Sequence, residues 1–286
     1  MKRPRRLEQM EQALRTANRK SDHHFIQDFL LITTPDNLTR WNSPYVPRAP
    51  WNPAWTNPRT GDAYSLCLCQ PRKTMTSPEL DACFALVQAT SQSDYEGSSR
   101  GWNPSAKREE MWDPDLRYIL VKDSHFAVQG FTSLMPTIEE GQPVIYCYEI
   151  HLKPGLRGTG LAKLLIELLE TVAYNIDVVD KVMLTVFTCN KRALEFYLKC
   201  GFVRDGISPQ PRMLRGGKVK MPDYEILSKR IEHRLLPAAK STCSNDVTGE
   251  TAPSQETEVE KGDGESTVAS PRPAKIAKLD RGEIGL

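Results

Sequence analysis

The sequence predicts a mixed α/β domain, in which a central, mostly antiparallel sheet is flanked by helices and followed by a disordered tail. Short apolar runs at 117–122, 125–135 and 144–152, joined by polar turns, predict an antiparallel meander. The periodicity then becomes helical over 158–175, β-like over 181–187, helical over 190–200 and β-like over 224–231. The first of these helices lies between two strands and permits parallel pairing, so the sheet is mixed.

Composition sets the extent of the domain. The chain has 286 residues, 39% of them hydrophobic and 26% charged, and no aromatic residue follows Tyr224. From Pro237 onward it cannot bury enough apolar surface to offset the entropy of ordering. We therefore divide the chain into a basic leader with an amphipathic helix (1–34), a Trp/Pro-rich loop with the first part of the domain (35–94), the domain core (95–235) and a disordered tail (236–286).

Several classes of protein are excluded. A net charge of +2 is too small for a protein that coats DNA. Purely apolar runs, such as that at 29–32, are far shorter than the roughly 20 residues of a membrane span, and no signal-peptide core follows the basic start, so we expect a soluble, non-secreted protein. The 7 cysteines lack CxxC spacing, which indicates neither a disulfide framework nor a zinc site.

The N-terminal region carries a basic cluster at 2–6 and then a helical stripe made by Leu7, Met10, Leu14 and Ala17. The cluster is either a nuclear-import or nucleic-acid signal or a solvated helix end. A second basic cluster lies at 271–278. Between 35 and 57, three tryptophans among many prolines predict an irregular loop packed on the domain.

A glycine-rich turn stands between the third strand and the first helix of the core, with the sequence Arg-Gly-Thr-Gly-Leu-Ala at 157–162. Glycines let the backbone approach a ligand closely, and free amides at a helix N-terminus attract an anion such as a pyrophosphate. Taken alone, the turn is compatible with phosphate binding or with a simple tight turn.

The preceding strand contains a candidate catalytic carboxylate, Glu149. Strict alternation would place Cys147, Glu149 and His151 on one face, and the even-numbered residues 144–152 on the other. Glu149 is either part of a site or a surface residue of a half-exposed strand. Cys147 is an alternative acyl-carrying nucleophile, although a small buried hydrophobe is the more common use of such a cysteine. His151 has no partner that the sequence reveals.

A second motif lies about thirty residues after the glycine turn, with the sequence Asn-Lys-Arg-Ala-Leu-Glu-Phe-Tyr-Leu-Lys-Cys-Gly-Phe at 190–202. Together with Arg-x-x-Gly-x-Ala it resembles the acetyl-CoA signature of the GNAT acetyltransferase superfamily. The resemblance implies the GNAT fold, a sheet that splays beside the third strand, and a loop that holds the cofactor pyrophosphate. The cofactor-binding residues that it implies are Ile150, His151, Leu152, Arg157, Gly158, Thr159, Gly160, Leu161, Ala162, Lys163 and Asn190.

Four further segments narrow the resemblance: Tyr-Cys-Tyr-Glu at 146–149, Lys-Arg-Glu-Glu-Met at 107–111, Val-Met-Leu-Thr-Val-Phe at 182–187 and Tyr-Glu-Ile-Leu-Ser at 224–228. They look like the NatD family of protein N-alpha-terminal acetyltransferases, over roughly residues 95–230. This implies acetyl transfer from acetyl-CoA, without a metal, to histone H4 and 2A tails that begin Ser-Gly-Arg-Gly. By this resemblance Glu149 is essential for catalysis, and we take it as the candidate general base. Tyr197 is our candidate to serve the leaving thiolate, at a position where some family members have Phe.

The same resemblance implies a peptide pocket whose members are Tyr95, Thr137, Ile138, Glu139, Tyr146, Tyr148, Thr185 and Tyr224. Within it Glu139 pairs with the arginine of the tail, because a carboxylate suits a guanidinium. The sequence departs from the family at Thr137, where the family has an acid, with Glu140 as a neighbouring substitute. It departs again at Arg100, which replaces a substrate-facing Trp, with Trp102 nearby.

Two other functions stay open at this point. A GNAT enzyme that acetylates lysine side chains or small amines would need stronger deprotonation, since lysine has a pKa near 10.4. A non-catalytic chromatin-binding module is the alternative outside enzymes. For the leading hypothesis we expect histone tails as partners, no membrane, no direct DNA readout, no auxiliary subunit, and a location in nucleus and cytoplasm.

Overall fold

The computed structural model describes residues 3–31 and 50–231, all within one compact unit. The predicted tail at 236–286, the basic cluster at 271–278 and Trp41 lie outside the described residues. So do residues 1–2 and the side chains of 3–5, which make up most of the basic leader. None of the helices in the described ranges combines the length and the apolarity needed to cross a bilayer.

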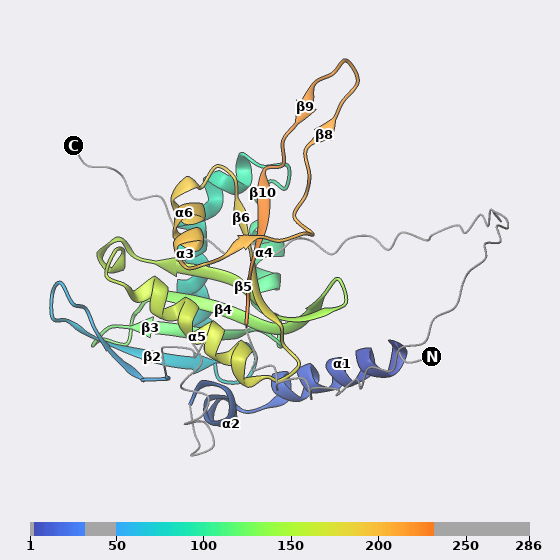
Figure 1. Ribbon diagram of the computed structural model, residues 1–286. Coiled ribbons are helices and arrows are strands. Elements are labelled where there is room, and N and C mark those ends of the chain that lie inside the picture. The colour runs from blue at the N-terminus through green and yellow to red at the C-terminus, as the bar shows by residue number, and fades with distance from the viewer. Residues whose placement is uncertain (1–2, 32–49, 232–286) are drawn as a thin grey trace, which may run out of the picture. The chain divides into compact units, whose positions relative to one another are not determined.

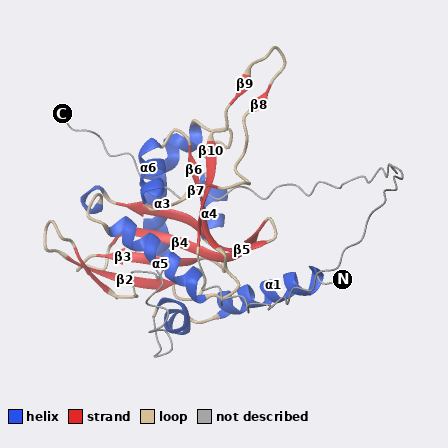
Figure 2. Ribbon diagram, in the orientation of Figure 1, coloured by secondary structure: helices blue, strands red, loops and turns tan. Residues whose placement is uncertain are grey.

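An eight-stranded mixed sheet forms the centre of the domain, in the order β1-β2-β3-β4-β5-β6-β10-β7 (Figures 1 and 2). Its strands are β1 Ala54–Thr56, β2 Ala63–Cys69, β3 Arg117–Lys122, β4 Val128–Glu139, β5 Gln142–Leu152, β6 Lys181–Phe187, β7 Val203–Arg204 and β10 Tyr224–Arg230. Every neighbouring pair is antiparallel except β5 and β6, which are parallel. The predicted meander and the mixed, mostly antiparallel sheet are therefore confirmed. A separate hairpin pairs β8 Arg212–Met213 with β9 Val219–Lys220.

Helices cover both faces of this sheet. They are α1 Arg3–Arg19, α2 Asp22–Phe25, the π-helical turn Ile26–Leu30, α3 Ser77–Glu96, α4 Pro104–Met111, the 3-10 turn Pro154–Leu156, α5 Leu161–Asn175 and α6 Lys191–Lys199. On one face Leu165 and Leu169 of α5 pack with Ile145 and Leu184; we call this cluster the α5-side core. On the other face α3 packs against β3, β4 and β5, and we call that cluster the α3-side core.

The region between 54 and 111 holds four elements that the sequence did not predict. β1 and β2 form a hairpin on the sheet, and α3 and α4 cover its second face. Trp55, expected in an irregular loop, lies in β1, and both Trp51 and Trp55 pack against the α5-side core. The polar residues Thr90, Ser91 and Asp94 are buried in α3, and they interrupt the apolar stripe by which a helix is recognised.

A β-bulge interrupts the ladder between β4 and β5. Ser133 pairs with Glu149, but the next residue, Leu134, pairs with Cys147, so Tyr148 is an extra residue on β5. Because successive side chains of a strand alternate between faces, one extra residue reverses the alternation beyond it.

The bulge corrects the predicted faces of β5. Ile145 and Cys147, before the bulge, share the α5-side core with Ile150 and Leu152, which follow it. The prediction that Cys147 shares a face with Glu149 is therefore wrong.

The sheet opens beside the same bulge. Parallel pairing of β5 with β6 runs from Val144 opposite Lys181 to Cys147 opposite Leu184, and stops there, although β5 continues to Leu152 and β6 to Phe187. This confirms the splay beside the third strand of the meander.

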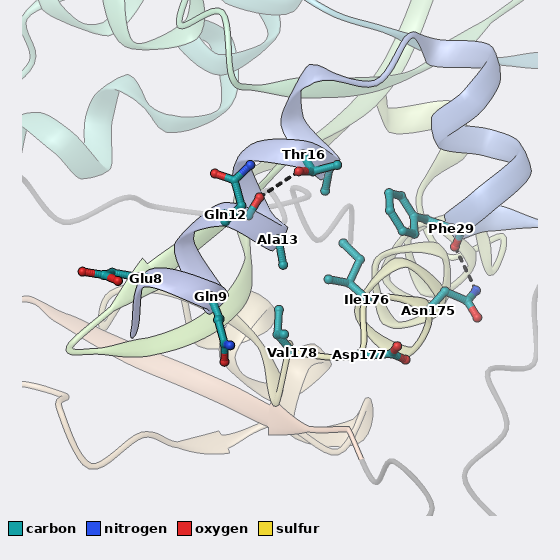
Figure 3. Close-up of a pocket in the computed structure, with 11 residues that line it drawn as sticks. Glu8, Gln9, Gln12, Ala13, Thr16, Phe29, Asn175, Ile176, Asp177 and Val178 are labelled. Atoms are coloured by element: carbon teal, nitrogen blue, oxygen red, sulfur yellow. Dashed lines mark hydrogen bonds between the residues drawn. The ribbon is translucent and has the colours of Figure 1, made fainter. Parts of the chain in front are cut away.

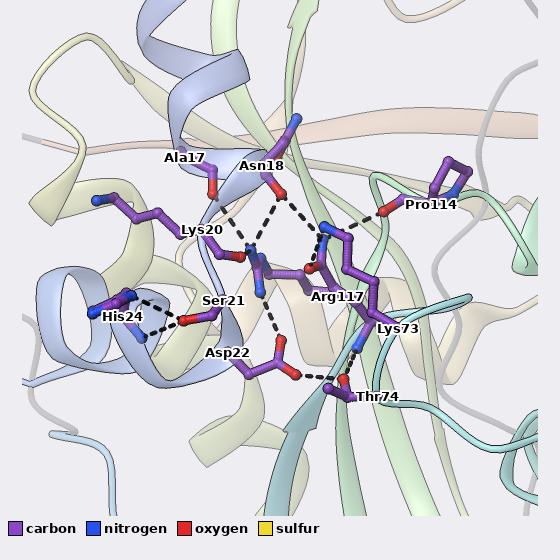
Figure 4. Close-up of polar contacts among 11 residues, drawn as sticks. Ala17, Asn18, Lys20, Ser21, Asp22, His24, Lys73, Thr74, Pro114 and Arg117 are labelled. Carbon is purple, nitrogen blue, oxygen red and sulfur yellow. Dashed lines mark hydrogen bonds and ion pairs between the residues drawn. The ribbon is translucent and has the colours of Figure 1, made fainter.

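Arg117 of β3 fastens the N-terminal helices to the sheet (Figure 4). Its side chain is fully buried, and Nη1 donates to Oδ1 of Asp22 at 2.8 Å. The guanidinium also donates to the main-chain carbonyls of Asn18 and Lys20 and lies 4.0 Å from the centre of the Phe25 ring. Burial lowers the pKa of Arg117 to about 10 despite Asp22, so it stays charged at neutral pH.

We expect Arg117→Ala to lower the free energy of unfolding by about 3–5 kcal/mol, because the Asp22 carboxylate loses its cationic partner and the carbonyl of Lys20 loses a donor. Urea unfolding measures this. Arg15→Ala, which removes an exposed pair with Glu11 on α1, is the control and should cost less than about 1 kcal/mol. Equal losses in the two variants would show that Arg117 does not anchor these helices.

Candidate active site

The side chain of Glu149 lies at the point where the bulge and the opening of the sheet coincide, and it is only 1% exposed. Oε1 pairs with the Nζ of Lys107 on α4, and Oε2 lies 2.5 Å from Nε2 of His151. Lys107 also donates to Oε1 of Glu110 at 2.5 Å. The sequence alone was compatible with Glu149 in a site or on the surface. In the structure Glu149 is buried within a charged cluster.

Local sequence explains how Lys107 reaches this position. Pro104 occupies the first turn of α4, and the side chain of Asn103 accepts a hydrogen bond from the amide of Ala106, which caps the helix. Lys107 and Met111 are one helical turn apart, and both are buried. The spacing of Lys107 four residues before an apolar methionine was the signal in the sequence that this lysine lies on the buried face of α4, where it pairs with Glu149.

The charges in the cluster set the protonation state of Glu149. Burial alone would raise the pKa of this carboxyl group, but Lys107 and the hydrogen bond with His151 outweigh burial and lower it. Burial alone would likewise lower the pKa of Lys107, and Glu110 and Glu149 together raise it. At neutral pH Glu149 is thus a carboxylate and Lys107 an ammonium group.

His151 has two partners that the sequence did not reveal. Its Nδ1 lies 2.7 Å from Oγ1 of Thr90 on α3, and its Nε2 contacts Glu149. The ring is fully buried and packs at 5.5 Å from the ring of Phe131. The expectation of a histidine without a side-chain partner is therefore wrong, because the bulge turns residue 151 toward α3.

Tyr197 of α6 carries an unused hydroxyl group. Its side chain is fully buried, and among the described residues its Oη has no hydrogen-bond partner. Burial, followed by the nearby Cys147 and Glu149, raises the pKa of this phenol well above its ordinary value. A protonated phenol with a free donor suits a ligand that brings an acceptor to it.

Cys147 differs from Glu149 in its surroundings. Its Sγ contacts Oγ1 of Thr132 and the main-chain oxygen of Glu149, each at 3.7 Å, and it belongs to the α5-side core. Burial raises the pKa of its thiol to about 12, which keeps it protonated. These features favour the buried-hydrophobe interpretation over an acyl-carrying nucleophile.

The glycine turn has the geometry of an anion-binding loop. Gly158 and Gly160 have φ of +68° and +89°, and Gly160 precedes α5 without any side-chain cap. Arg59, between β1 and β2, donates to the carbonyl of Gly158 at 2.7 Å and to that of Arg157 at 3.4 Å. The residues present therefore fit a pyrophosphate at the uncapped amides of α5.

Other predicted cofactor residues surround this turn. Ile150, His151 and Leu152 lie on β5 beyond the last pair with β6, where the strand edge facing β6 carries no ladder. Asn190 is buried and its side chain caps α6 by accepting from the amide of Ala193 at 3.0 Å, so it has a structural role beside its predicted one. The remaining loop residues occupy the start of α5 or the turn before it; they are Arg157, Thr159, Leu161, Ala162 and Lys163.

The predicted peptide residues fall into two groups. Tyr95 and Tyr224 cluster with Phe187 and Trp102, and Lys107 lies 5.6 Å from the ring of Tyr95, which joins this cluster to the Glu149 cluster. The other members of the first group are Tyr146 and Thr185, whose hydroxyls lie 2.6 Å apart, and Tyr148, whose hydroxyl donates to the sulfur of Met135 at 3.6 Å. The second group consists of the last three residues of β4, which are partly exposed: Thr137, Ile138 and Glu139.

An open pocket of about 770 Å³ lies elsewhere, between α1 and the residues that follow α5 (Figure 3). Gln12 and Ala13 line one side, and Ile176 and Val178 the other. None of the predicted site residues borders it. Among the described residues, no group of three or more His, Cys, Asp or Glu side chains is placed to hold a metal.

Comparison with known proteins identifies related sequences. The model of the acetyltransferase (GNAT) family matches residues 85–202. The N-alpha-acetyltransferase 40 of Saccharomyces cerevisiae is 34% identical over 174 residues, which cover 50% of this chain and 60% of that protein. The chain thus matches less than two thirds of the length of this relative.

Two solved structures are similar to part of the chain. The ribosomal-protein-S18-alanine N-acetyltransferase from Escherichia coli is 15% identical, with a TM-score of 0.41, and covers 61% of this chain and 99% of that one. The Arabidopsis thaliana NAA60 in complex with a bisubstrate analogue is 13% identical, also with a TM-score of 0.41, and covers 58% and 98% of the two chains.

We expect Lys107→Met to destabilise the fold by about 3–5 kcal/mol at pH 7, because two carboxylates lose their ammonium partner. In the wild type the pKa of Glu149 lies below its unfolded value, so its contribution to stability is present at neutral pH. In the variant, burial raises the pKa of Glu149, and protonation below that pKa relieves the penalty. Urea unfolding from pH 7.5 to pH 5 should therefore show the gap between the two proteins narrowing with acid, whereas a constant gap would contradict the ion pair.

Proposed function

Because the model of the acetyltransferase (GNAT) family matches residues 85–202 and the matched relative is an N-alpha-acetyltransferase, we propose that the protein transfers the acetyl group of acetyl-CoA to the free amino terminus of a protein. The observation that carries the proposal is the buried, ionised Glu149 at the opening of the sheet. Its partner Lys107 also lies against the ring of Tyr95, in a tyrosine cluster that suits a peptide, and the glycine turn that follows its strand suits a pyrophosphate.

Glu149 is the general base in this proposal. An α-amino group has a pKa of about 7.7–8.0, so at neutral pH most of it is protonated and must lose a proton before it attacks. Glu149 accepts this proton directly or through one water. The amine nitrogen then forms a bond to the thioester carbonyl carbon, and the carbon–sulfur bond breaks.

Tyr197 completes the proton balance. The departing sulfur takes a proton from the phenol, and the phenol recovers one from the nitrogen, which loses its second proton as the amide forms. The products are an acetylated amino terminus, a free thiol and one proton on Glu149. The Oη of Tyr197 supports this role, because no residue in the described part of the chain accepts a hydrogen bond from it.

Acetyl-CoA supplies the activated acetyl group when it is bound. The uncapped start of α5 and the positive-φ glycines would hold its pyrophosphate. The open edge of β5 at 150–152 would hold its pantetheine arm. No metal is assigned a role.

The finer part of the proposal concerns the substrate, which we take to be the Ser-Gly-Arg-Gly start of histones H4 and 2A. It rests on the resemblance of the motifs at 107–111, 146–149 and 224–228, and on Glu139 as a partly exposed carboxylate for the arginine of the tail. Thr137 and Arg100, at which the sequence departs from the family, affect which peptide sequence the proposed enzyme prefers. Action without an auxiliary subunit, in nucleus and cytoplasm, belongs to the same proposal.

We expect acetyl transfer to a Ser-Gly-Arg-Gly-Lys peptide, none to the same peptide with a blocked amino terminus, and a loss of at least about a hundredfold in Glu149→Gln. Glu109→Gln, an exposed acid on α4, is the matched control and should retain full activity. Equal labelling of the blocked peptide would identify a lysine acetyltransferase. Labelling of neither peptide, despite binding of acetyl-CoA, would reject this substrate class.

We expect Tyr197→Phe to lower kcat by about tenfold or more while acetyl-CoA binding is kept. The free energy of unfolding should stay constant or rise, because the variant removes a buried hydroxyl that has no partner in the described part of the chain. Steady-state kinetics and thermal unfolding on the same preparations test both effects. A loss of stability with unchanged kcat would show that the hydroxyl serves the fold instead.

A further inference from the structure

A chain of three short contacts runs from α3 to the candidate base. Oγ1 of Thr90 lies 2.7 Å from the main-chain oxygen of Leu86, and 2.7 Å from Nδ1 of His151. Nε2 of His151 then lies 2.5 Å from Oε2 of Glu149. Thr90, His151 and Glu149 are all buried.

Counting protons along this chain fixes the state of the histidine. A carbonyl oxygen has no proton to give, so the single hydroxyl proton of Thr90 is donated to Leu86. Nδ1 of His151 must then carry the proton of the next contact and donate it to Thr90. The last contact needs one more proton, which lies between Nε2 of His151 and Oε2 of Glu149.

This count describes the loaded state of the pair, with one shared proton. That state is either an imidazolium beside a carboxylate or a neutral imidazole beside a carboxylic acid, and the two forms differ only in which atom holds the proton. The state that accepts a proton from the substrate is the one without this proton, in which Glu149 is a carboxylate. When that proton leaves, the lone pair of Nε2 faces a carboxylate oxygen at hydrogen-bond distance. Thr90 holds the other ring proton in place, so the ring does not change tautomer to relieve the repulsion.

We propose that Glu149 and His151 form one proton-accepting couple, in which Glu149 takes the proton from the substrate amine and shares it with Nε2 of His151, while Thr90 fixes the tautomer of the ring. This deepens the proposed function and rests on it. Glu149 remains the catalytic residue, and His151 and Thr90 are positioning residues that act through it. The proton passes from the amine nitrogen to Oε2 and Nε2, and leaves through the same carboxylate after the product departs.

The surroundings leave the couple free to change its charge. The groups that face it are Lys107 and Glu110 of α4, Tyr95 of α3, Tyr118 of β3, Tyr197 of α6 and Cys147 of β5. Burial raises the pKa of the tyrosines and of the cysteine, so they are neutral. Lys107 and Glu110 carry opposite charges and are paired with one another. A proton gained by the couple is therefore not repelled by a net positive environment.

A first experiment reads the tautomer without using activity. The full chain, labelled with ¹⁵N-histidine, contains 5 histidines, and the signals of His151 are identified by their loss in His151→Gln. We expect Nδ1 to be protonated throughout the titration, and Nε2 to gain its proton as the couple is loaded. Thr90→Val should release the ring to the opposite tautomer, and Thr90→Ser, which keeps the hydroxyl, should restore it. A neutral ring protonated only at Nε2 in the wild type would overturn the proposal, whether or not the peptide assay succeeds.

A second experiment separates proton sharing from simple support of the fold. Glutamine in His151→Gln donates a hydrogen bond to Glu149 but stores no proton. We expect kcat to fall at least about tenfold above neutral pH, with KM for acetyl-CoA retained. The difference should shrink toward acid, because the wild-type couple becomes loaded there and loses its advantage as a proton acceptor.

The same peptide is used throughout, so titration of its amine cancels in the ratio of the two rates. His125→Gln, on the exposed turn between β3 and β4, is the control and should follow the wild-type profile at every pH. Parallel pH profiles for His151→Gln and wild type would mean a structural role only and would overturn the proposal. If His151→Gln does not fold, the pH profiles of Thr90→Val and Thr90→Ser are compared instead, and only Thr90→Ser should follow the wild type.

Discussion

The negative charge of Glu149 inside the domain is the constraint on which the arrangement of the site depends. A buried carboxylate costs several kcal/mol unless opposite charge and hydrogen bonds surround it. Lys107 supplies that charge from α4, and Glu110 balances Lys107 in turn. Helix α4 must therefore dock where it does, and α3 beside it brings Thr90 to His151. Charge compensation thus determines where the second layer of helices packs.

One irregularity in the ladder produces two features of the site. The extra residue Tyr148 reverses the alternation of β5, which directs Glu149 and His151 toward α3 and leaves Ile150 and Leu152 in the α5-side core. Pairing with β6 ends at Cys147, immediately before the same residue. The carboxylate and the open strand edge consequently lie side by side, and the proposed function places its base and its acyl donor at this one point of the sheet.

Features that depend on residues close together in the sequence could be predicted, and features that depend on residues far apart in the sequence could not. Periodicity is local, and so the strands of the meander, helix α5 and strand β6 are found at the predicted places. The bulge depends on the pairing of two strands, and neither strand alone encodes it. Thr90 and His151 are 61 residues apart, and Arg117 and Asp22 are 95 apart, so no local pattern announces either contact. Helix α3 was missed because its buried polar residues, which include Thr90, weaken the apolar stripe.

The clamp of Arg59 on the glycine turn has a consequence for how this chain varies through evolution. A Cβ atom added at Gly158 would lie 2.9 Å from Nη2 of Arg59, and the φ of +68° already disfavours a side chain there. Arg59 belongs to a hairpin that is remote in sequence from the turn, yet it shares the space that this glycine leaves free. We therefore expect the two positions to vary together: loss of the arginine removes one of the two barriers to replacing the glycine, and a side chain at 158 displaces the end of the arginine.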